Sequence, residues 1–461
     1  MKKILLVILS LYLMFTDIHA EGGTLLEKKV KSKADSIKTG WTFGALPAVA
    51  YDRDVGFKYG ALVNLYNFGN GSRYPMYDHS IYMEYSRTTK GSNLAQLRYD
   101  SDVLIPGIRM SSEIRYQTEQ ALDFYGFNGY QSKYNRAFET DNDTSNYISR
   151  MFYRQDRKLT RLRADFSGKL LTKNLKWFAG IEFYHDAIDT VNLGKLNKGK
   201  DEEDLLPPVQ GGLYQMYLDR GIIPSKEATG GTHTLLKAGF IFDTRDNEPN
   251  PMKGIWTEAI LIFAPGFLGD KNMTYAKLAI THRQYFTIIP KDLNFAYRLS
   301  YQGKLFGEMP SYMLPLVFNS PPNFTRDGLG GRNTVRGVMR NRIVGEGILY
   351  GNTELRWKFL HTKLFKQNFH LALSGFLDGG MVVQEYKINT SDVPDNFKIN
   401  GKTYYKSDFF TGEKDRPHFG TGGGIHFAMN DNFILAVDYG FAFRPEDDGK
   451  SAFYIDMDWL F

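Results

Sequence analysis

The segment Phe453–Phe461 reads FYIDMDWLF, and its side chains alternate between apolar and polar at almost every position. Successive side chains of an extended chain point to opposite faces. One face would carry Phe453, Ile455, Met457, Trp459 and Phe461, and the other would carry Tyr454, Asp456 and Asp458. This period of two is typical of a β-strand with one apolar and one polar surface, and we predict such a strand over 451–461.

The same alternation recurs from Trp41 to the end of the chain. Sixteen segments show it: 41–52, 55–68, 79–88, 94–104, 108–118, 157–169, 175–188, 231–246, 253–264, 273–289, 292–306, 346–360, 368–383, 417–430, 432–444 and 451–461. Most are long enough to cross a bilayer at a tilt, and an even number is typical of bacterial outer-membrane barrels. A soluble sandwich also alternates, but it rarely repeats strands of this length so many times.

The lengths of the connections support a barrel independently. Long connections follow odd-numbered segments, at 119–156, 189–230, 307–345 and 384–416. Most connections after even-numbered segments are tight turns, and 69–78 is the longest of them. Outer-membrane barrels have short periplasmic turns and long external loops. We therefore predict an all-β fold, a 16-stranded antiparallel transmembrane β-barrel over residues 40–461.

The composition agrees with a barrel in the bacterial outer membrane. Aromatic residues make up 15% of the chain, with 29 Tyr and 34 Phe, although the mean hydropathy is only −0.37. Barrels combine these features because they alternate lipid-facing and lumen-facing residues and carry aromatic girdles. The expected neighbours are outer-membrane lipids, lipopolysaccharide and phospholipid. The net charge of +6 is modest and mixed in sign, so nucleic acid is not an expected partner.

The first twenty residues have the features of a secretory signal peptide. A basic head, Met1-Lys2-Lys3, precedes the apolar run from Ile4 to Phe15, and Ala20 ends a plausible cleavage site. The run is too short to span a bilayer as a helix. We expect residues 21–39 to form a short periplasmic segment. The chain has no cysteine, so we expect neither a disulfide nor a lipid anchor.

Three motifs occur in a fixed order on the predicted strands. Segment 242–247 reads FDTRDN at the end of the eighth strand, loop segment 328–337 reads GLGGRNTVRG, and segment 376–380 on the thirteenth strand reads FLDGG. Each motif alone is weak. Together they resemble the barrel of the BamA/TamA (bacterial surface antigen) superfamily, and the resemblance covers residues 40–461.

The resemblance implies that the sixth external loop folds back into the lumen. There the tip, Val335-Arg336-Gly337, would meet the strand motif that contains Phe376, Asp378 and Gly380, with Glu354 as a second carboxylate. Alternation places Phe376, Asp378 and Glu354 on inward, polar faces. Inward Gly420, Gly422 and Gly424 would leave room for the loop. The alternative is that Arg336 is a solvated loop residue and that the glycines only bend a strand.

The residues Asp243, Arg245 and Asp246 are expected to form a structural signature that holds a periplasmic turn by hydrogen bonds. No nucleophile accompanies them, and the His residues lack metal-ligand spacing. We therefore expect no enzyme activity, no cofactor and no metal. The large members of the resembled family carry POTRA modules before the barrel, and we expect this chain to belong to a POTRA-less, barrel-only branch.

The resemblance favours a barrel that assists insertion or translocation of protein or lipid at a lateral seam between the first and last strands. Pro47 lacks the amide hydrogen needed for a sheet ladder, so we predict a short ladder there, with Phe461 on the other side of the seam. Two alternatives remain: a passive pore or transporter, and a structural or adhesion barrel that acts through its surface loops. A second copy of the chain or other envelope proteins are candidate partners.

Overall fold

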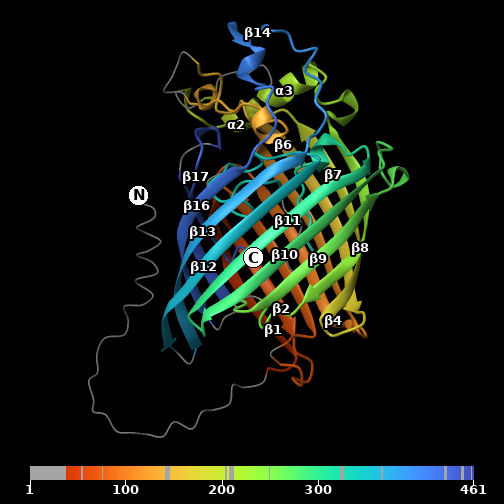
Figure 1. Ribbon diagram of the computed structural model, residues 1–461, viewed down its shortest axis with the longest axis vertical. Coiled ribbons are helices and arrows are strands. Elements are labelled where there is room, and N and C mark those ends of the chain that lie inside the picture. Colours follow the sequence, from red (N-terminus) through yellow and green to blue (C-terminus); the bar gives the residue numbers. More distant parts are fainter. Residues whose placement is uncertain are drawn as a thin grey trace, which may run out of the picture. The chain divides into compact units, whose positions relative to one another are not determined.

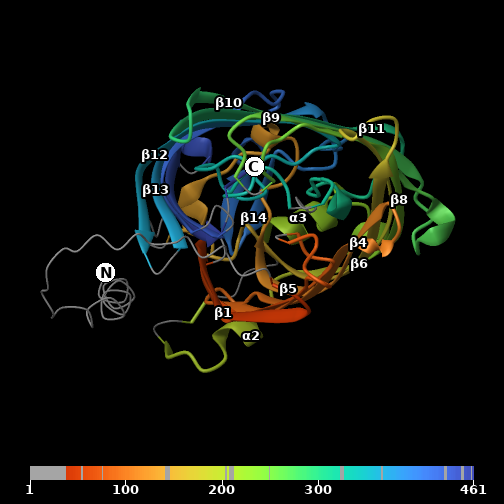
Figure 2. The same ribbon diagram turned by 90° about the horizontal axis from the view of Figure 1, so that it is seen from below.

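Sixteen strands close into one antiparallel ring in the computed structural model (Figures 1 and 2). The structure describes residues 38–461, except 53–55, 75, 141–145, 203–204, 207–211, 249, 322–326, 365–366, 430–432, 448–450 and 458. The predicted signal peptide and most of the segment 21–39 lie outside the described residues. The ring confirms the predicted fold class and strand number.

The wall strands follow one another around the ring in chain order, and β18 returns to β1. They are β1 (Trp41–Asp52), β2 (Gly56–Asn67), β3 (His79–Thr88), β4 (Asn93–Ile105), β5 (Ile108–Asp123), β6 (Arg154–Lys169), β7 (Leu175–Asp189), β8 (Gly230–Asp243), β9 (Gly254–Ala264), β10 (Tyr275–Ile289), β11 (Leu293–Gly307), β12 (Gly347–Leu364), β13 (Gln367–Gln384), β16 (His418–Met429), β17 (Phe433–Ala442) and β18 (Ser451–Met457). Each strand agrees with a predicted segment, with shifts at the ends.

Alternation sorts the side chains between lumen and lipid, as β10 illustrates. Lys277 and Arg283 are buried on the inner face, whereas Ile280 and Phe286 are exposed on the outer face. Inward polar side chains find partners in the lumen, and outward apolar side chains suit the hydrocarbon of a bilayer. None of the helices in the described ranges has the length and apolar character needed to cross a membrane.

The long connections gather at one end of the barrel (Figure 1). They contain α2 (Leu193–Asn197), α3 (Gly212–Asp219) and a two-stranded sheet of β14 (Asn396–Ile399) and β15 (Lys402–Tyr405). Short 3-10 turns are η1 (Gly129–Gln131), η2 (Arg136–Phe138), η4 (Ser225–Glu227), η5 (Gly266–Leu268), η6 (Ser311–Met313), η7 (Lys406–Asp408) and η8 (Pro445–Asp447). Aromatic side chains of these connections, such as Phe124, Tyr217 and Phe409, belong to a buried cluster that also includes residues of the wall strands, and we call these packed connections the cap.

The end of the last strand differs from the prediction. Strand β18 ends at Met457, and Trp459 and Phe461, which were predicted on the lipid-facing side, are buried together with Leu460. The ring of Trp459 stacks on His426 at 4.0 Å between centroids, and its indole nitrogen donates to Asn250 at 3.0 Å. Trp459 therefore lies in the lumen and not on the lipid-facing side that alternation predicts, because its buried indole N–H needs an acceptor and Asn250 provides one.

Candidate functional site

The connection between β11 and β12, residues 308–346, enters the interior of the ring, where it is drawn in teal in Figure 2. Val335 and Leu329 form a buried cluster with Tyr350 of β12. Gly380 of β13 makes room for this contact, since a Cβ there would lie 3.2 Å from side-chain atoms of all three residues. The described part of this connection is therefore packed into the lumen.

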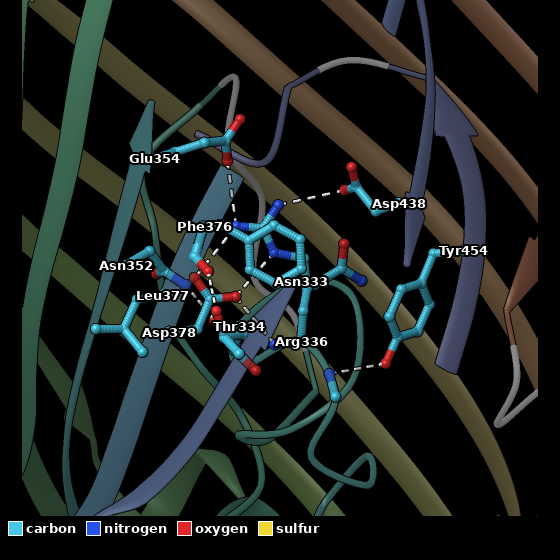
Figure 3. A network of polar contacts seen from close by, with 12 residues as sticks. Asn333, Thr334, Arg336, Asn352, Glu354, Phe376, Leu377, Asp378, Asp438 and Tyr454 are labelled. Carbon is cyan, nitrogen blue, oxygen red and sulfur yellow. Dashed lines mark hydrogen bonds and ion pairs between the residues drawn. The ribbon is translucent and has the colours of Figure 1, made fainter. Parts of the chain in front are cut away.

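Arg336 at the tip of this loop is completely buried and contacts three inward carboxylates (Figure 3). Its Nε donates to Oδ2 of Asp378 at 2.8 Å, and its Nη2 donates to Oδ1 of Asp378 at 3.1 Å. Further contacts reach Glu354 at 3.1 Å and Asp438 at 3.3 Å. We call this group the Arg336 clamp. Its burial contradicts the alternative of a solvated Arg336.

The clamp also places the guanidinium against an aromatic ring. The central carbon of the Arg336 guanidinium lies 3.4 Å from the ring centre of Phe376, an arrangement that a desolvated cation favours. Gly422 of β16 leaves space for the ring, because a Cβ there would lie 2.7 Å from Cζ of Phe376. Phe376 thus covers the face of the Arg336 guanidinium, and Asp378 accepts hydrogen bonds at its edge.

Two glycines allow the loop tip to approach the wall closely. Gly337 has a φ of +90°, and a Cβ at this position would lie 2.5 Å from the backbone of Phe441. Its amide donates to the hydroxyl of Tyr454 at 3.2 Å. On the wall, a Cβ at Gly420 would lie 1.9 Å from the carbonyl oxygen of Arg336. Only residues without a side chain fit at these two positions.

The predicted turn signature lies directly after β8, which ends at Asp243 instead of continuing to 246. The carboxylate of Asp243 accepts from the amide and from Nε of Arg245, at 3.1 and 3.0 Å. Oδ1 of Asp246 accepts from the amides of Met252 and Lys253, at 3.0 and 3.2 Å. These side chains satisfy backbone donors in the turn, and this interrupts the strand pattern earlier than alternation suggests.

The junction between β1 and β18 is much shorter than its neighbours. Strand β1 pairs with β2 along its whole length, whereas Tyr51 and Ile455 form the only register pair with β18 that the described residues give. Continuing that antiparallel register would bring Pro47 opposite residue 459. Because residue 459 has turned into the lumen, no described residue of β18 forms a register pair with the half of β1 that contains Pro47.

Phe461 therefore does not belong to the junction, contrary to the prediction. It is buried next to Tyr285 and Ala296, on the inner faces of β10 and β11, and its carbonyl oxygen accepts from Arg356 at 2.9 Å. The inward turn after Met457 gives the end of the chain polar and apolar partners that the lipid-facing side lacks. Pro47 lies in β1, where it pairs with Ala61 of β2.

Comparisons with known proteins support the assignment of this architecture. The Omp85 superfamily domain matches residues 99–457. The chain belongs to the Omp85 superfamily. Membership confirms the resemblance drawn from the loop and strand motifs, and it identifies the protein as a β-barrel of the outer membrane. No curated protein matches the chain.

Two solved structures share the fold of this Omp85 barrel. One is BamA from Haemophilus ducreyi lacking POTRA domains 1-3, at 15% identity and a TM-score of 0.52, with 91% of this chain and 70% of that chain covered. The other is CdiB from Escherichia coli, at 11% identity and a TM-score of 0.54, with 92% and 63% covered. The chain thus spans less than two thirds of the length of CdiB, and identities this low show the fold alone.

A second charged group of the Omp85 barrel holds the same loop to the opposite wall. Asp327 and Arg340 flank the tip, and they meet Glu119 of β5 and Arg157 of β6. Arg157 donates to Asp327 through both Nη atoms, at 3.0 and 2.9 Å, and through Nε to Glu119 at 3.0 Å. Arg340 contacts Glu119 at 2.7 Å and also Asp327. We call these four residues the β5–β6 clamp.

Sequence reasoning missed this second clamp and one member of the first. Asp438 of β17 is the member of the Arg336 clamp that was not predicted, because no motif in the sequence connects it with Arg336. The β5–β6 clamp joins residues from two strands and both flanks of the loop, and no short motif contains them. Glu119 belongs to the predicted connection 119–156, and only the structure places it in β5, which continues to Asp123. Within the described ranges, no cluster of His, Asp and Glu could hold a metal ion.

A hydrogen-bonded cluster fastens the cap to the end of the wall. Nδ1 of His418 lies 2.7 Å from Asp447, its Nε2 lies 3.0 Å from Asp415, and its ring stacks on Tyr130 at 3.8 Å between centroids. Burial opposes the charge on Asp447. Three interactions outweigh this effect of burial: the hydrogen bond with His418, the charges of His418 and Arg342, and the hydrogen bond from Tyr130. The pKa of Asp447 is therefore lowered.

Proposed function

We propose that this Omp85 barrel assists insertion or translocation of protein or lipid at the β1–β18 junction, which acts as a lateral seam. The observation that carries the proposal is the short ladder at this junction, for which the described residues give one register pair, Tyr51 with Ile455, compared with the full ladder between β1 and β2. A strand edge with unpaired N–H and C=O groups can pair with an incoming strand. Separating one pair costs far less than separating a complete ladder.

The two loop clamps support a controlled seam rather than a free channel. The Arg336 clamp contacts β12, β13 and β17, and the β5–β6 clamp contacts the opposite side of the ring. In this proposal Val335, Arg336, Gly337, Phe376, Asp378, Gly380 and Glu354 lock the loop in place. A loop that crosses the lumen between two walls disfavours the passive-pore alternative.

Outer-membrane lipids are the partners that follow most directly from this proposal. Trp41 and Phe43 on the unpaired half of β1 are 57% and 78% exposed, so lipid would contact the seam. Unfolded envelope proteins or a second copy of the chain could pair with the same edge. The transferred material is a protein strand or a lipid, and separate assays of protein insertion and lipid movement distinguish the two.

A disulfide across the seam tests the proposal, because the chain has no cysteine of its own. Tyr51→Cys and Ile455→Cys would be directly opposite each other, at a Cα separation within the range that a disulfide bridges. The matched control is Val49→Cys with Tyr59→Cys, which joins β1 to β2. Both purified variants are placed in phospholipid vesicles and assayed before and after oxidation.

One assay follows the insertion of an unfolded β-barrel protein into the vesicles, and the other follows movement of a fluorescent phospholipid between leaflets. We expect oxidation to abolish at least one activity in the seam variant, reduction to restore it, and the control to be unaffected. An oxidised seam variant with full activity, or a wild-type protein inactive in both assays, would contradict the proposal.

A further inference from the structure

The connection between β9 and β10, residues 265–274, exposes two large apolar side chains at its tip. Phe267 is 82% exposed and Leu268 is 40% exposed, and both lie in the 3-10 turn η5. In both views the connection, drawn in bright green, extends outside the ring of strands (Figures 1 and 2). Water is an unfavourable environment for an exposed phenyl ring, so a partner is expected.

The tip is held in place by hydrogen bonds on both sides. The amide of Gly266 donates to Oγ1 of Thr274 at 3.0 Å. The amide of Asp270 donates to the carbonyl oxygen of Thr232, and the amide of Thr232 donates to Oδ1 of Asp270, at 3.2 and 2.9 Å. The connection is thus fastened to β8, and the exposure of Phe267 is a fixed feature of the fold.

The tip is continuous with the lipid-facing surface of the wall. Phe263, at the end of β9, is opposite Leu236 of β8 and Ala276 of β10 in register. Its ring lies 6.5 Å from that of Phe306 on β11. The outward apolar band therefore ends in an aromatic row on this side, and Phe267 follows only four residues after Phe263.

We infer that this connection is a membrane anchor whose Phe267 and Leu268 insert into the outer leaflet of the bilayer. The occupant of this surface is lipid acyl chain, because the surface continues the band that already faces lipid. Asp270 and Lys271, which follow the apolar pair, remain in the headgroup region. An aromatic ring at this boundary matches the preference of aromatic residues for membrane interfaces.

Single cysteines test this inference. Phe267→Cys reports on the tip, Ile280→Cys on the lipid-facing wall, and Thr403→Cys on the exposed β15 strand of the cap. Each variant is labelled with an environment-sensitive fluorophore and placed in phospholipid vesicles. Quenching is measured with doxyl-labelled phospholipid from the membrane and with iodide from the water, over several protein-to-lipid ratios. Slower migration after boiling confirms that each variant is folded.

We expect the label at 267 to resemble the label at 280, with at least twofold stronger doxyl quenching and at least twofold weaker iodide quenching than the label at 403. Iodide quenching at 267 equal to that at 403 would overturn the inference. Protection at 267 that vanishes as lipid is added in excess would also overturn it, because a second copy of the chain would then be the partner.

Discussion

The Arg336 clamp and the β5–β6 clamp hold one loop to opposite walls, but they distribute charge differently. The first gathers three carboxylates around a single loop cation, with Arg356 and His426 next to Glu354 and Asp438. The second alternates two arginines with two carboxylates. The Arg336 clamp therefore depends on one cation, whereas in the β5–β6 clamp two cations and two carboxylates balance one another.

Removing the central cation should have the largest effect. Arg336→Ala leaves Asp378 buried without the cation that it contacts twice, and breaking a buried pair from one side typically costs roughly 3–5 kcal/mol. The free energy of unfolding is measured in detergent by urea titration, with heat-dependent gel migration as a second readout. The control is Arg332→Ala in the same loop, whose ion-pair partner Asp456 is only partly buried. Equal losses for both variants would contradict a special role of Arg336.

The second prediction concerns coupling within the Arg336 clamp. Asp378→Ala should destabilise the barrel about as much as Arg336→Ala, because each change leaves the other charge unpaired in the lumen. Residues in direct contact are not additive, so the double variant should cost much less than the sum of the two. The same urea titrations measure this difference. Fully additive losses would show that the two side chains act independently.

Loss of one charged side chain should destabilise the barrel less in the β5–β6 clamp than in the Arg336 clamp. Asp327→Asn should cost on the order of 1–3 kcal/mol, below the loss in Arg336→Ala, since Glu119 still faces both arginines. Adding Arg340→Gln should recover part of the loss, because the remaining Glu119 and Arg157 form a neutral pair. Unfolding in urea checks the order of the three variants. If the double variant lost more than both single variants combined, the idea of a shared balance would be wrong.

The smallest expected effect is the pH dependence of the cap. A carboxyl whose pKa is lowered on folding contributes stability above its unfolded value, and this is lost as the pH falls through the folded pKa. Asp447 should therefore contribute stability at neutral pH that declines below about pH 4. Thermal unfolding of the wild type and of Asp447→Asn measures the decline. The Asp447→Asn variant should lose less stability than the wild type as the pH falls. If both proteins lose the same stability, Asp447 is not the group responsible.

Much of the wall could be predicted from the sequence, because lipid on one side and polar lumen on the other impose strict alternation. The same phase placed Phe376, Asp378 and Glu354 inward, and the family resemblance connected them to Arg336. Alternation failed where tertiary partners competed with it. Trp459 continues the apolar phase of β18, but Asn250 and His426 draw it inward. The β5–β6 clamp could not be predicted, because its four residues meet only when the ring is closed.

The loop has a mechanical consequence for the whole ring. It is attached at β5–β6 and, on the opposite side of the ring, at β12, β13 and β17, and the β1–β18 junction lies between these two attachment points. A loop attached at two opposite walls keeps the distance between those walls fixed and so resists deformation of the barrel cross-section. If the proposed seam widens, we therefore expect the bending in β18 and in β1 to β4, which lie between the two attachment points of the loop.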